Sequence, residues 1–267
     1  MRWDIKMFNI INQISEFFST VTTIVKGIIE RRYNRKLLER RAIIELIRFF
    51  IVPLKEWFYD QMGKDTGGFE EFNVEKLQFF LKNSNFRETH TLPPLEILYT
   101  HFNSLIERLP HKSEWNEKVQ EYNKLTYDLN KKLSELEHNV RKFLDENQDV
   151  KRIYDDNAEA NKKYPRYDSF KYELARKFYQ QYRSSLIGNA LAGAWFYAGK
   201  EIFEQVIFHN KPILEEIEKL KEERKHVLEK LISILEQLQT HLMKEYNIAH
   251  FKEVSVTFIS PNPGMEF

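Results

Sequence analysis

The sequence predicts an all-α protein, built as an antiparallel bundle of long helices. Two segments, 113–148 and 212–246, carry apolar residues spaced alternately three and four apart, and a third, 168–209, carries an apolar stripe at four-residue steps. Such spacing places apolar side chains on one face of a helix. Because the two heptad segments match in length and have broad apolar faces, they favour an intramolecular bundle over an extended coiled-coil rod.

The first thirty residues predict an amphipathic helix. Its apolar face is formed by Met7, Ile10, Ile14, Phe17, Val21, Ile24 and Ile28. Polar neighbours such as Asn12 and Glu16 would be costly at membrane depth, so a single membrane span is the least favoured outcome. The favoured outcome is packing against the body or a partner helix. Lying on a membrane surface is the alternative.

The strongest charge asymmetry follows this helix. Its cations are Lys26, Arg31, Arg32, Arg35, Lys36, Arg40 and Arg41. Against Glu30 and Glu39 they give residues 26–41 a net charge of +5, which would attract an anionic membrane surface or a nucleic-acid backbone. A solvated helix face has the same composition. These seven side chains are the candidate contact with an anionic surface.

A second helix continues from the basic run to Pro53, which should end or kink it. Residues 62–68 contain three glycines and predict a loop. A short helix over 74–82 is expected next, and then a helix from an N-cap at Thr91 to Leu109. This pattern divides the chain into an N-terminal helical segment, 1–60, and a bundle body, 61–267.

The stretch 186–198 is expected to be the centre of the bundle. It carries no charge, and small residues recur four apart, as in Gly188 and Ala192 or Ala190 and Ala194. Small residues at this spacing let neighbouring helices approach closely, so the stretch predicts the middle of one buried helix over 168–209.

Two polar segments flank the predicted long helices. Residues 147–166 predict a connection without a calcium loop, because they contain no glycine. Near the C-terminus, Val254, Val256 and Phe258 alternate with polar residues, which predicts either a small β element or a tail lying on the bundle.

No motif for catalysis, for a metal or for a cofactor emerges from the sequence. The pairs Glu135 with His138 and Glu223 with His226 have the Glu-x-x-His spacing of di-iron bundles, but their register places them on outer faces. The glycines at 188 and 193 lack the Lys-Ser/Thr of a phosphate loop. There is no cysteine, which excludes disulfides and thiolate metal sites.

These observations favour a non-enzymatic helical interaction or scaffold protein that binds a protein partner or itself. The total charge is balanced, with 41 basic and 40 acidic residues, which argues against a general polyanion binder. Three alternatives stay open: a peripheral membrane protein held by residues 1–41, a nucleic-acid-binding accessory protein, and an enzyme with a site not legible from sequence. We expect a cytoplasmic protein, with membrane association as the alternative.

Overall fold

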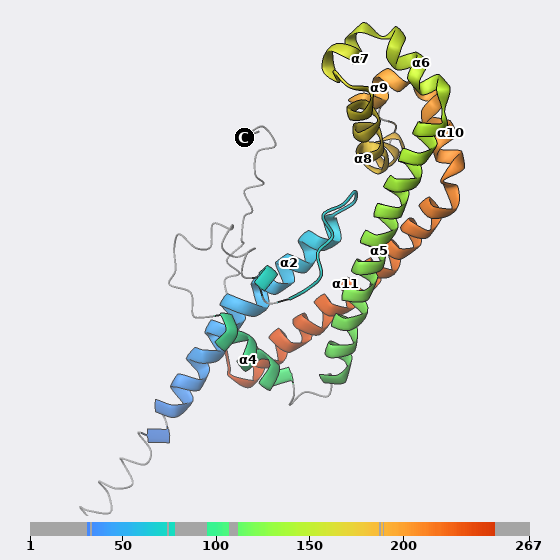
Figure 1. The fold of residues 1–267 in the computed structure, drawn as a ribbon. Coiled ribbons are helices and arrows are strands. Elements are labelled where there is room, and N and C mark those ends of the chain that lie inside the picture. Colours follow the sequence, from blue (N-terminus) through green and yellow to red (C-terminus); the bar gives the residue numbers. More distant parts are fainter. Residues whose placement is uncertain are drawn as a thin grey trace, which may run out of the picture.

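A computed structural model describes residues 31–32, 34–73, 75–77, 95–106, 112–186, 188 and 190–248. Within these ranges the chain is helical and no strand is formed, in agreement with the predicted all-α class. The molecule is elongated, with two long helices running along its length and shorter helices gathered at each end (Figure 1).

The two long helices are α5 (Lys112–Glu146) and α11 (Lys211–Glu245). They pack side by side and run in opposite directions. Their bounds lie within two residues of the predicted heptad segments. Regular spacing made them predictable, because an apolar residue at every third or fourth position leaves one face that must be buried.

Two hydrophobic cores lie at opposite ends of this pair. Core 1 joins the C-terminal half of α11 to α2 (Val52–Gly63) and α4 (Leu95–Ile106). It is built around fully buried rings such as Trp57 and Phe102. Core 2 joins the C-terminal half of α5 to α8 (Tyr167–Leu186) and to the short helices beside α8. It is built around Phe178 and Trp195. The chain therefore has a core toward each end of this pair, and the cores meet at its middle, the waist, where the end of α2 and the loop after it also pack against α5 and α11.

The first described helix is exposed at its N-terminal end and is buried in core 1 from Ile43 onward. Residues 34–46 are helical, and they lead through a π-helix, η1 (Ile47–Ile51), into α2 (Figure 1). Pro53 was expected to end or kink the helix. The helix does not end there; because proline has no N–H to donate to the carbonyl of Phe49, the α-helical pattern is interrupted and the backbone widens into the π-helix just before it.

The polar segment 147–166 is more structured than the sequence suggested. It contains α6 (Gln148–Asp156) and α7 (Ala158–Lys163). Asn147 and Asn157 cap these helices, because each side-chain oxygen accepts a hydrogen bond from a backbone N–H in the first turn. Val150 and Tyr154 then bury one face of α6 in core 2.

The prediction of one continuous helix over 168–209 is wrong. The structure contains α8, then a non-helical stretch, then α9 (Ala194–Ala198) and α10 (Lys200–His209). Gly188, Gly193 and Gly199 have φ values of 89°, 61° and 85°, a region that a right-handed helix cannot use. The glycines therefore serve backbone turns, whereas Ala194 and Ala198 are buried in core 2 on the short helix α9.

The proposed buried centre, 186–198, is correspondingly not one buried helix: residues 190–193 are non-helical, and part of the stretch lies at the surface. Leu186 is 60% exposed and Phe196 is 67% exposed, while Trp195 and Ala194 are buried in core 2. Gln181 of α8 holds the turn in place, because its amide oxygen accepts from the N–H of Ala192 at 2.9 Å.

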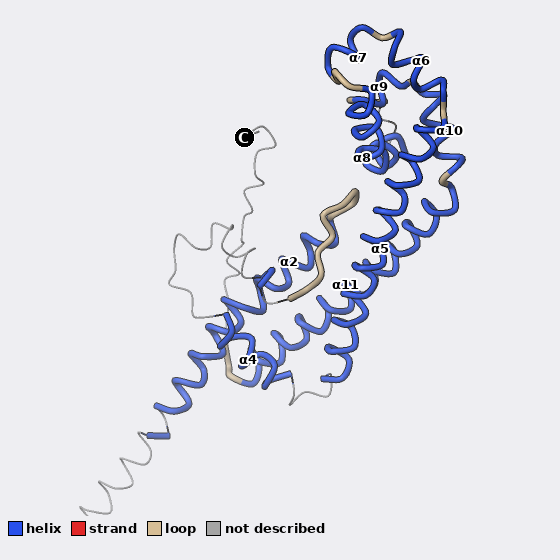
Figure 2. Tube along the Cα trace, in the orientation of Figure 1, coloured by secondary structure: helices blue, strands red, loops and turns tan. Residues whose placement is uncertain are grey.

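Figure 2 shows the long loop that follows α2 running back alongside that helix. The loop begins at Lys64, in agreement with the glycine-rich segment at 62–68. The predicted helix over 74–82 is described only at residues 75–77, which are helical. The predicted amphipathic helix at 1–30 and the β element near Val254 lie outside the described residues. The division proposed at residue 60 falls within α2.

Candidate functional site

A buried arginine lies between α5 and α11 at the waist of the molecule. Arg224 of α11 is only 3% exposed, and its Nε donates to the hydroxyl of Thr126 on α5 at 3.0 Å. Its two terminal nitrogens donate to the backbone carbonyl of Gln61 at 3.0 Å, to the Gln61 side-chain oxygen at 3.1 Å and to the Tyr122 hydroxyl at 2.8 Å. The guanidinium thus ties α11 to both α5 and the end of α2.

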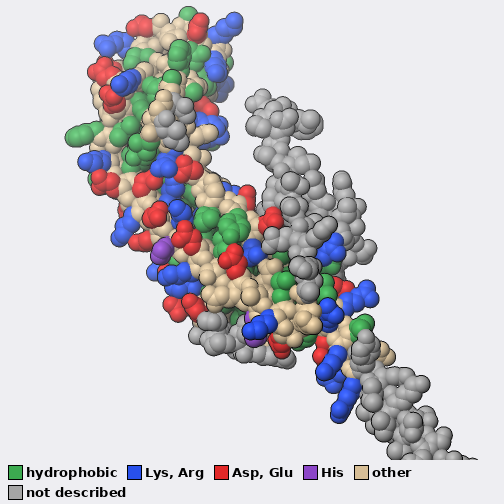
Figure 3. Space-filling view, turned by 180° about the vertical axis from the view of Figure 1, so that it is seen from behind, with side chains coloured by type: hydrophobic (Ala, Val, Ile, Leu, Met, Phe, Trp, Pro, Cys, Tyr) green, Lys and Arg blue, Asp and Glu red, His purple; other side chains and the backbone are tan. Residues whose placement is uncertain are grey.

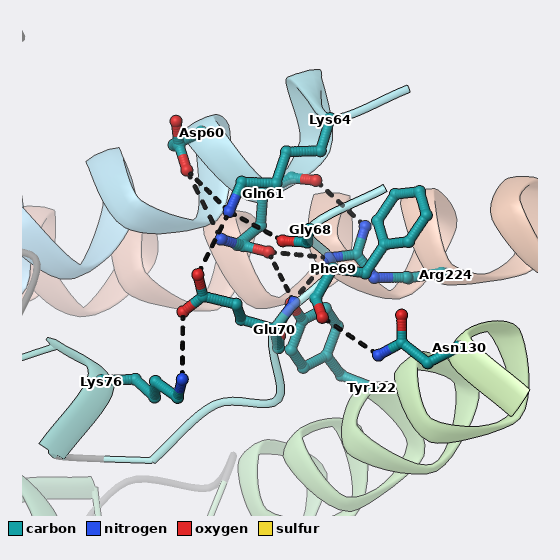
Figure 4. Close-up of polar contacts among 10 residues, drawn as sticks. All are labelled: Asp60, Gln61, Lys64, Gly68, Phe69, Glu70, Lys76, Tyr122, Asn130 and Arg224. Carbon is teal, nitrogen blue, oxygen red and sulfur yellow. Dashed lines mark hydrogen bonds and ion pairs between the residues drawn. The ribbon is translucent and has the colours of Figure 1, made fainter. Parts of the chain in front are cut away.

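The loop after α2 closes over this arginine, as Figure 4 shows. The ring of Phe69 lies 4.9 Å from the guanidinium carbon of Arg224, within the range of a cation–π contact. Asn130 donates to the carbonyl of Phe69 at 3.1 Å, and Tyr122 donates to the carbonyl of Glu70 at 2.6 Å. The position of the loop is therefore fixed by α5 and α11 together.

Beside the loop is a charged cleft of about 320 Å³. It is bounded by the start of the loop, the end of α8 and the middle of α11. Its charged lining residues are Lys64, Asp65, Arg183, Glu218, Lys221, Glu222, Arg224 and Lys225. Five cations and three carboxylates thus face one small space.

Asp65 is the centre of the ion pairs in this cleft. The guanidinium of Arg183 meets its two carboxylate oxygens at 3.1 and 2.9 Å, and Lys221 donates to it at 2.5 Å. Burial by itself would raise the pKa of the Asp65 carboxyl, but the hydrogen bonds from Lys221 and Arg183 outweigh burial and lower the pKa below its usual range. Asp65 is therefore ionised at neutral pH.

Glu218 holds a second group of contacts at the same place. Its carboxylate accepts from Arg183 at 2.8 Å and from the hydroxyl of Tyr179 at 2.8 Å. Burial and this hydrogen bond to Glu218 raise the pKa of the Tyr179 phenol far above its ordinary value. Burial also lowers the pKa of Arg224, but a guanidinium remains charged in proteins.

The predicted anionic contact residues lie on the projecting N-terminal helix, away from this cleft. Arg31, Arg32, Arg35, Lys36, Arg40 and Arg41 are all exposed, whereas Lys26 lies outside the described residues. Arg35 and Arg41 pair with glutamates one turn later, at 3.0 and 3.3 Å, and Arg40 donates to the carbonyl of Asn247 at 3.1 Å. Arg31, Arg32 and Lys36 make no ion pair with any described residue.

The two pairs with di-iron spacing lie on exposed helix faces, as their register predicts. Glu135, His138, Glu223 and His226 all point toward solvent and belong to two separate helices. Nowhere in the described ranges do three His, Asp or Glu side chains gather closely enough to hold a metal ion. None of the described helices combines the length and the apolar character needed to cross a membrane.

The sequence contained a signal for the buried arginine that the prediction did not use. The apolar seam of α11 runs through Ile217, Leu220 and Val227 and has a gap at position 224, where the three-four spacing requires a core residue. Thr126 fills the matching position in α5. Two polar residues at seam positions predict a buried polar layer, but the glutamine and the loop that complete it could not be inferred from spacing.

Comparison with known proteins finds no relative: no family model, curated protein or solved structure matches the chain. Function is therefore inferred from the geometry alone.

Proposed function

We propose that this chain is a non-enzymatic helical interaction protein that binds an acidic surface of a protein partner through the basic helix at residues 31–41. One observation carries the proposal: this helix is formed and positively charged, and Arg40 donating to the carbonyl of Asn247 is the one hydrogen bond described between it and the body. Side chains 31–32 and 34–41 are all exposed, and the first buried one among the described residues is Ile43. The helix projects from the rest of the molecule (Figure 1).

This segment is the exposed end of a helix that continues through η1 into α2. Most helical stability in proteins comes from burying an apolar face, and the described side chains at this end bury none, so it is the weakly stabilised part of the helix. The ion pairs from Arg35 to Glu39 and from Arg41 to Glu45 each contribute only a few tenths of a kcal/mol. A partner that covers this helix would supply the missing contacts.

The distribution of charge favours a protein over a membrane. Basic residues one turn apart form separate rows on this helix, such as Arg31 with Arg35 and Arg32 with Lys36. A helix that lies on a membrane needs distinct apolar and polar faces. Among the described residues 31–32 and 34–41, the exposed apolar side chains are Leu37 and Leu38, at 52% and 66% exposure, and Lys36 and Arg40 lie close to them in the sequence. Figure 3 shows Lys and Arg side chains gathered on this helix, whereas acidic and basic side chains are mixed over the body.

The same charges argue against self-association through this surface, because two copies would bring like charges together. They also argue for an acidic partner, since residues 31–41 contain six basic residues and a single acidic one, Glu39. The balanced charge of the whole chain opposes a general nucleic-acid binder.

The protonation states in the cleft support a binding role over acid–base catalysis. A general acid or base works best with a pKa near the operating pH. Asp65 in the cleft has a lowered pKa, and Tyr179, which donates to Glu218 beside the cleft, has a raised one, so both pKa values move away from neutrality.

The test begins with a photo-cross-linker at Leu38, which identifies the partner. The purified partner is then titrated with the parent, with a charge variant and with a matched control. The charge variant changes Arg31, Arg32, Arg35 and Lys36 to Gln; the control changes Lys151, Arg152, Lys162 and Lys200 to Gln at the other end of the molecule. We expect the charge variant to weaken binding about tenfold or more, in a salt-dependent manner, and the control to match the parent.

The alternatives are tested in parallel. Binding of the parent to phosphatidylserine vesicles that falls in the charge variant and in a Leu37→Ser, Leu38→Ser variant would replace the proposal by the membrane interpretation. Salt-sensitive binding to duplex or single-stranded nucleic acid that falls only in the charge variant would replace it by the nucleic-acid interpretation.

A further inference from the structure

The charged cleft beside the α2 loop is not used by the proposed protein contact. Its volume of about 320 Å³ lies at the lower end of the range for small-molecule sites. The lining cations outnumber the lining carboxylates by five to three. Lys64 is partly neutralised from outside the cleft, by Asp60 at 3.6 Å and Glu70 at 3.5 Å.

Arg224 gives the wall of the cleft a fixed positive charge. Every acceptor described for its guanidinium is neutral: two hydroxyls, one amide oxygen and one backbone carbonyl. Burying a charge without an opposite charge is costly, so buried cations are normally paired with a carboxylate. In a cleft with low-dielectric walls, such a charge attracts anions to the space in front of it.

Asp65 already occupies the position of an anion in this cleft. Arg183 binds the Asp65 carboxylate through two nitrogen–oxygen contacts, at 3.1 and 2.9 Å, and Lys221 adds a third contact at 2.5 Å. A planar guanidinium binds carboxylate and phosphate with the same two-point geometry. Asp65 remains partly exposed and lies on a loop that turns through positive φ at Gly67 and Gly68. Its carboxylate is therefore held by side-chain contacts and not by burial.

We propose that the cleft binds the phosphate group of a small soluble molecule, and that Asp65 takes the place of this group in the free protein. The phosphate oxygens would meet Arg183 and Lys221 in place of Asp65. Lys225 at the rim makes no ion pair with any described residue and would add a further cation. Glu218 keeps its contact with Tyr179 and does not need to move.

The test is titration calorimetry with pyrophosphate on the full chain at low ionic strength, compared with sodium chloride at matched ionic strength. Asp65→Asn should bind pyrophosphate about tenfold more tightly than the parent, because it no longer competes for two cations. Lys225→Gln should weaken binding about two- to fivefold, the range of one exposed ion pair. Lys219→Gln, an exposed lysine on α11 outside the cleft, is the matched control and should bind like the parent.

Circular dichroism checks that each variant is folded before titration. If Asp65→Asn does not fold, Lys225→Glu at its exposed position provides the second comparison and should weaken binding further than Lys225→Gln. Saturable binding that responds to these variants in the stated order supports the proposal. The proposal is overturned if neither the parent nor Asp65→Asn binds pyrophosphate, or if all variants bind it equally.

Discussion

Arg224 of α11 donates to the hydroxyl of Thr126 on α5 at the level where the two hydrophobic cores meet. On one side of this pair, Tyr122 and Val227 belong to core 1; on the other side, Leu129 belongs to core 2. A slip of either helix by one turn would leave the guanidinium without its acceptors. Buried polar residues at seam positions fix the register of paired helices, and this pair has the position to do so.

Removing this side chain should destabilise the whole waist. Arg224→Ala leaves a void and strips Gln61 and Tyr122 of a donor, so we expect a loss of about 3 kcal/mol in the free energy of unfolding, measured in urea. Arg224→Met should cost less, because it keeps the aliphatic volume and removes a buried charge. Lys219→Ala is the exposed control. If Arg224→Ala unfolds at the same urea concentration as this control, the arginine is not a structural centre.

The non-helical stretch 190–193 before α9 predicts opposite behaviour for two alanines. Ala192 is exposed, so Ala192→Leu should change stability by less than about 0.5 kcal/mol. Ala194 is buried in core 2, so Ala194→Leu should overpack it and cost about 1 to 3 kcal/mol. Thermal melts of both variants decide the point. Equal destabilisation by both would restore the continuous helix that the sequence predicted.

Glycine 199 should be required for the break between α9 and α10. Its φ of 85° and ψ of 164° lie in a region that is almost closed to other residues, so Gly199→Ala should cost about 1 to 3 kcal/mol. Gly63, at the end of α2, has no positive φ, and a Cβ there would meet nothing within 4 Å. Gly63→Ala should therefore be neutral or slightly stabilising in the same melts. A harmless Gly199→Ala would show that this backbone geometry is not needed.

The ion pairs of Asp65 predict a specific dependence on pH. Because its folded pKa is lowered, Asp65 contributes stability that is present above its unfolded pKa of 3.8 and is lost as the pH falls through the lower folded value. The difference in urea midpoint between the parent and Asp65→Asn should be constant near neutral pH and should shrink below pH 3.8. A difference that persists undiminished at still lower pH would mean that Asp65 acts through packing and not through its charge.

The elements that the sequence predicted well are the helices in which apolar residues recur three and four apart without interruption. The bounds of α5 and α11 followed directly from their seams, because burial of one face decides both where a helix lies and where it ends. The segment 186–198 failed for the opposite reason. Small residues four apart occur in close helix contacts and also in turns, and only the backbone angles at Gly188 and Gly193 separate the two.

The cleft could be predicted only in part. The loop at 62–68 was recognised from its glycines, and the gap at Arg224 marked a polar position in the seam. The grouping of Asp65 with Arg183 and Lys221 joins residues more than a hundred positions apart, and spacing carries no information about such contacts. Asparagine is a common N-cap residue, so Asn147 and Asn157 could have indicated the starts of α6 and α7. The polar composition of the segment instead favoured a connection without helices.

The central claim is that the basic helix ending at Arg41 is an interaction helix that buries no described side chain against the body, and amide hydrogen exchange tests it most directly. In the purified free chain, we expect the amides of residues 34–41 to exchange far faster than those of α11 around Leu231, because no buried face protects them. Addition of the acidic partner should slow exchange in 34–41 and leave Leu231 unchanged. Protection of residues 34–41 in the free chain equal to that at Leu231 would contradict the account.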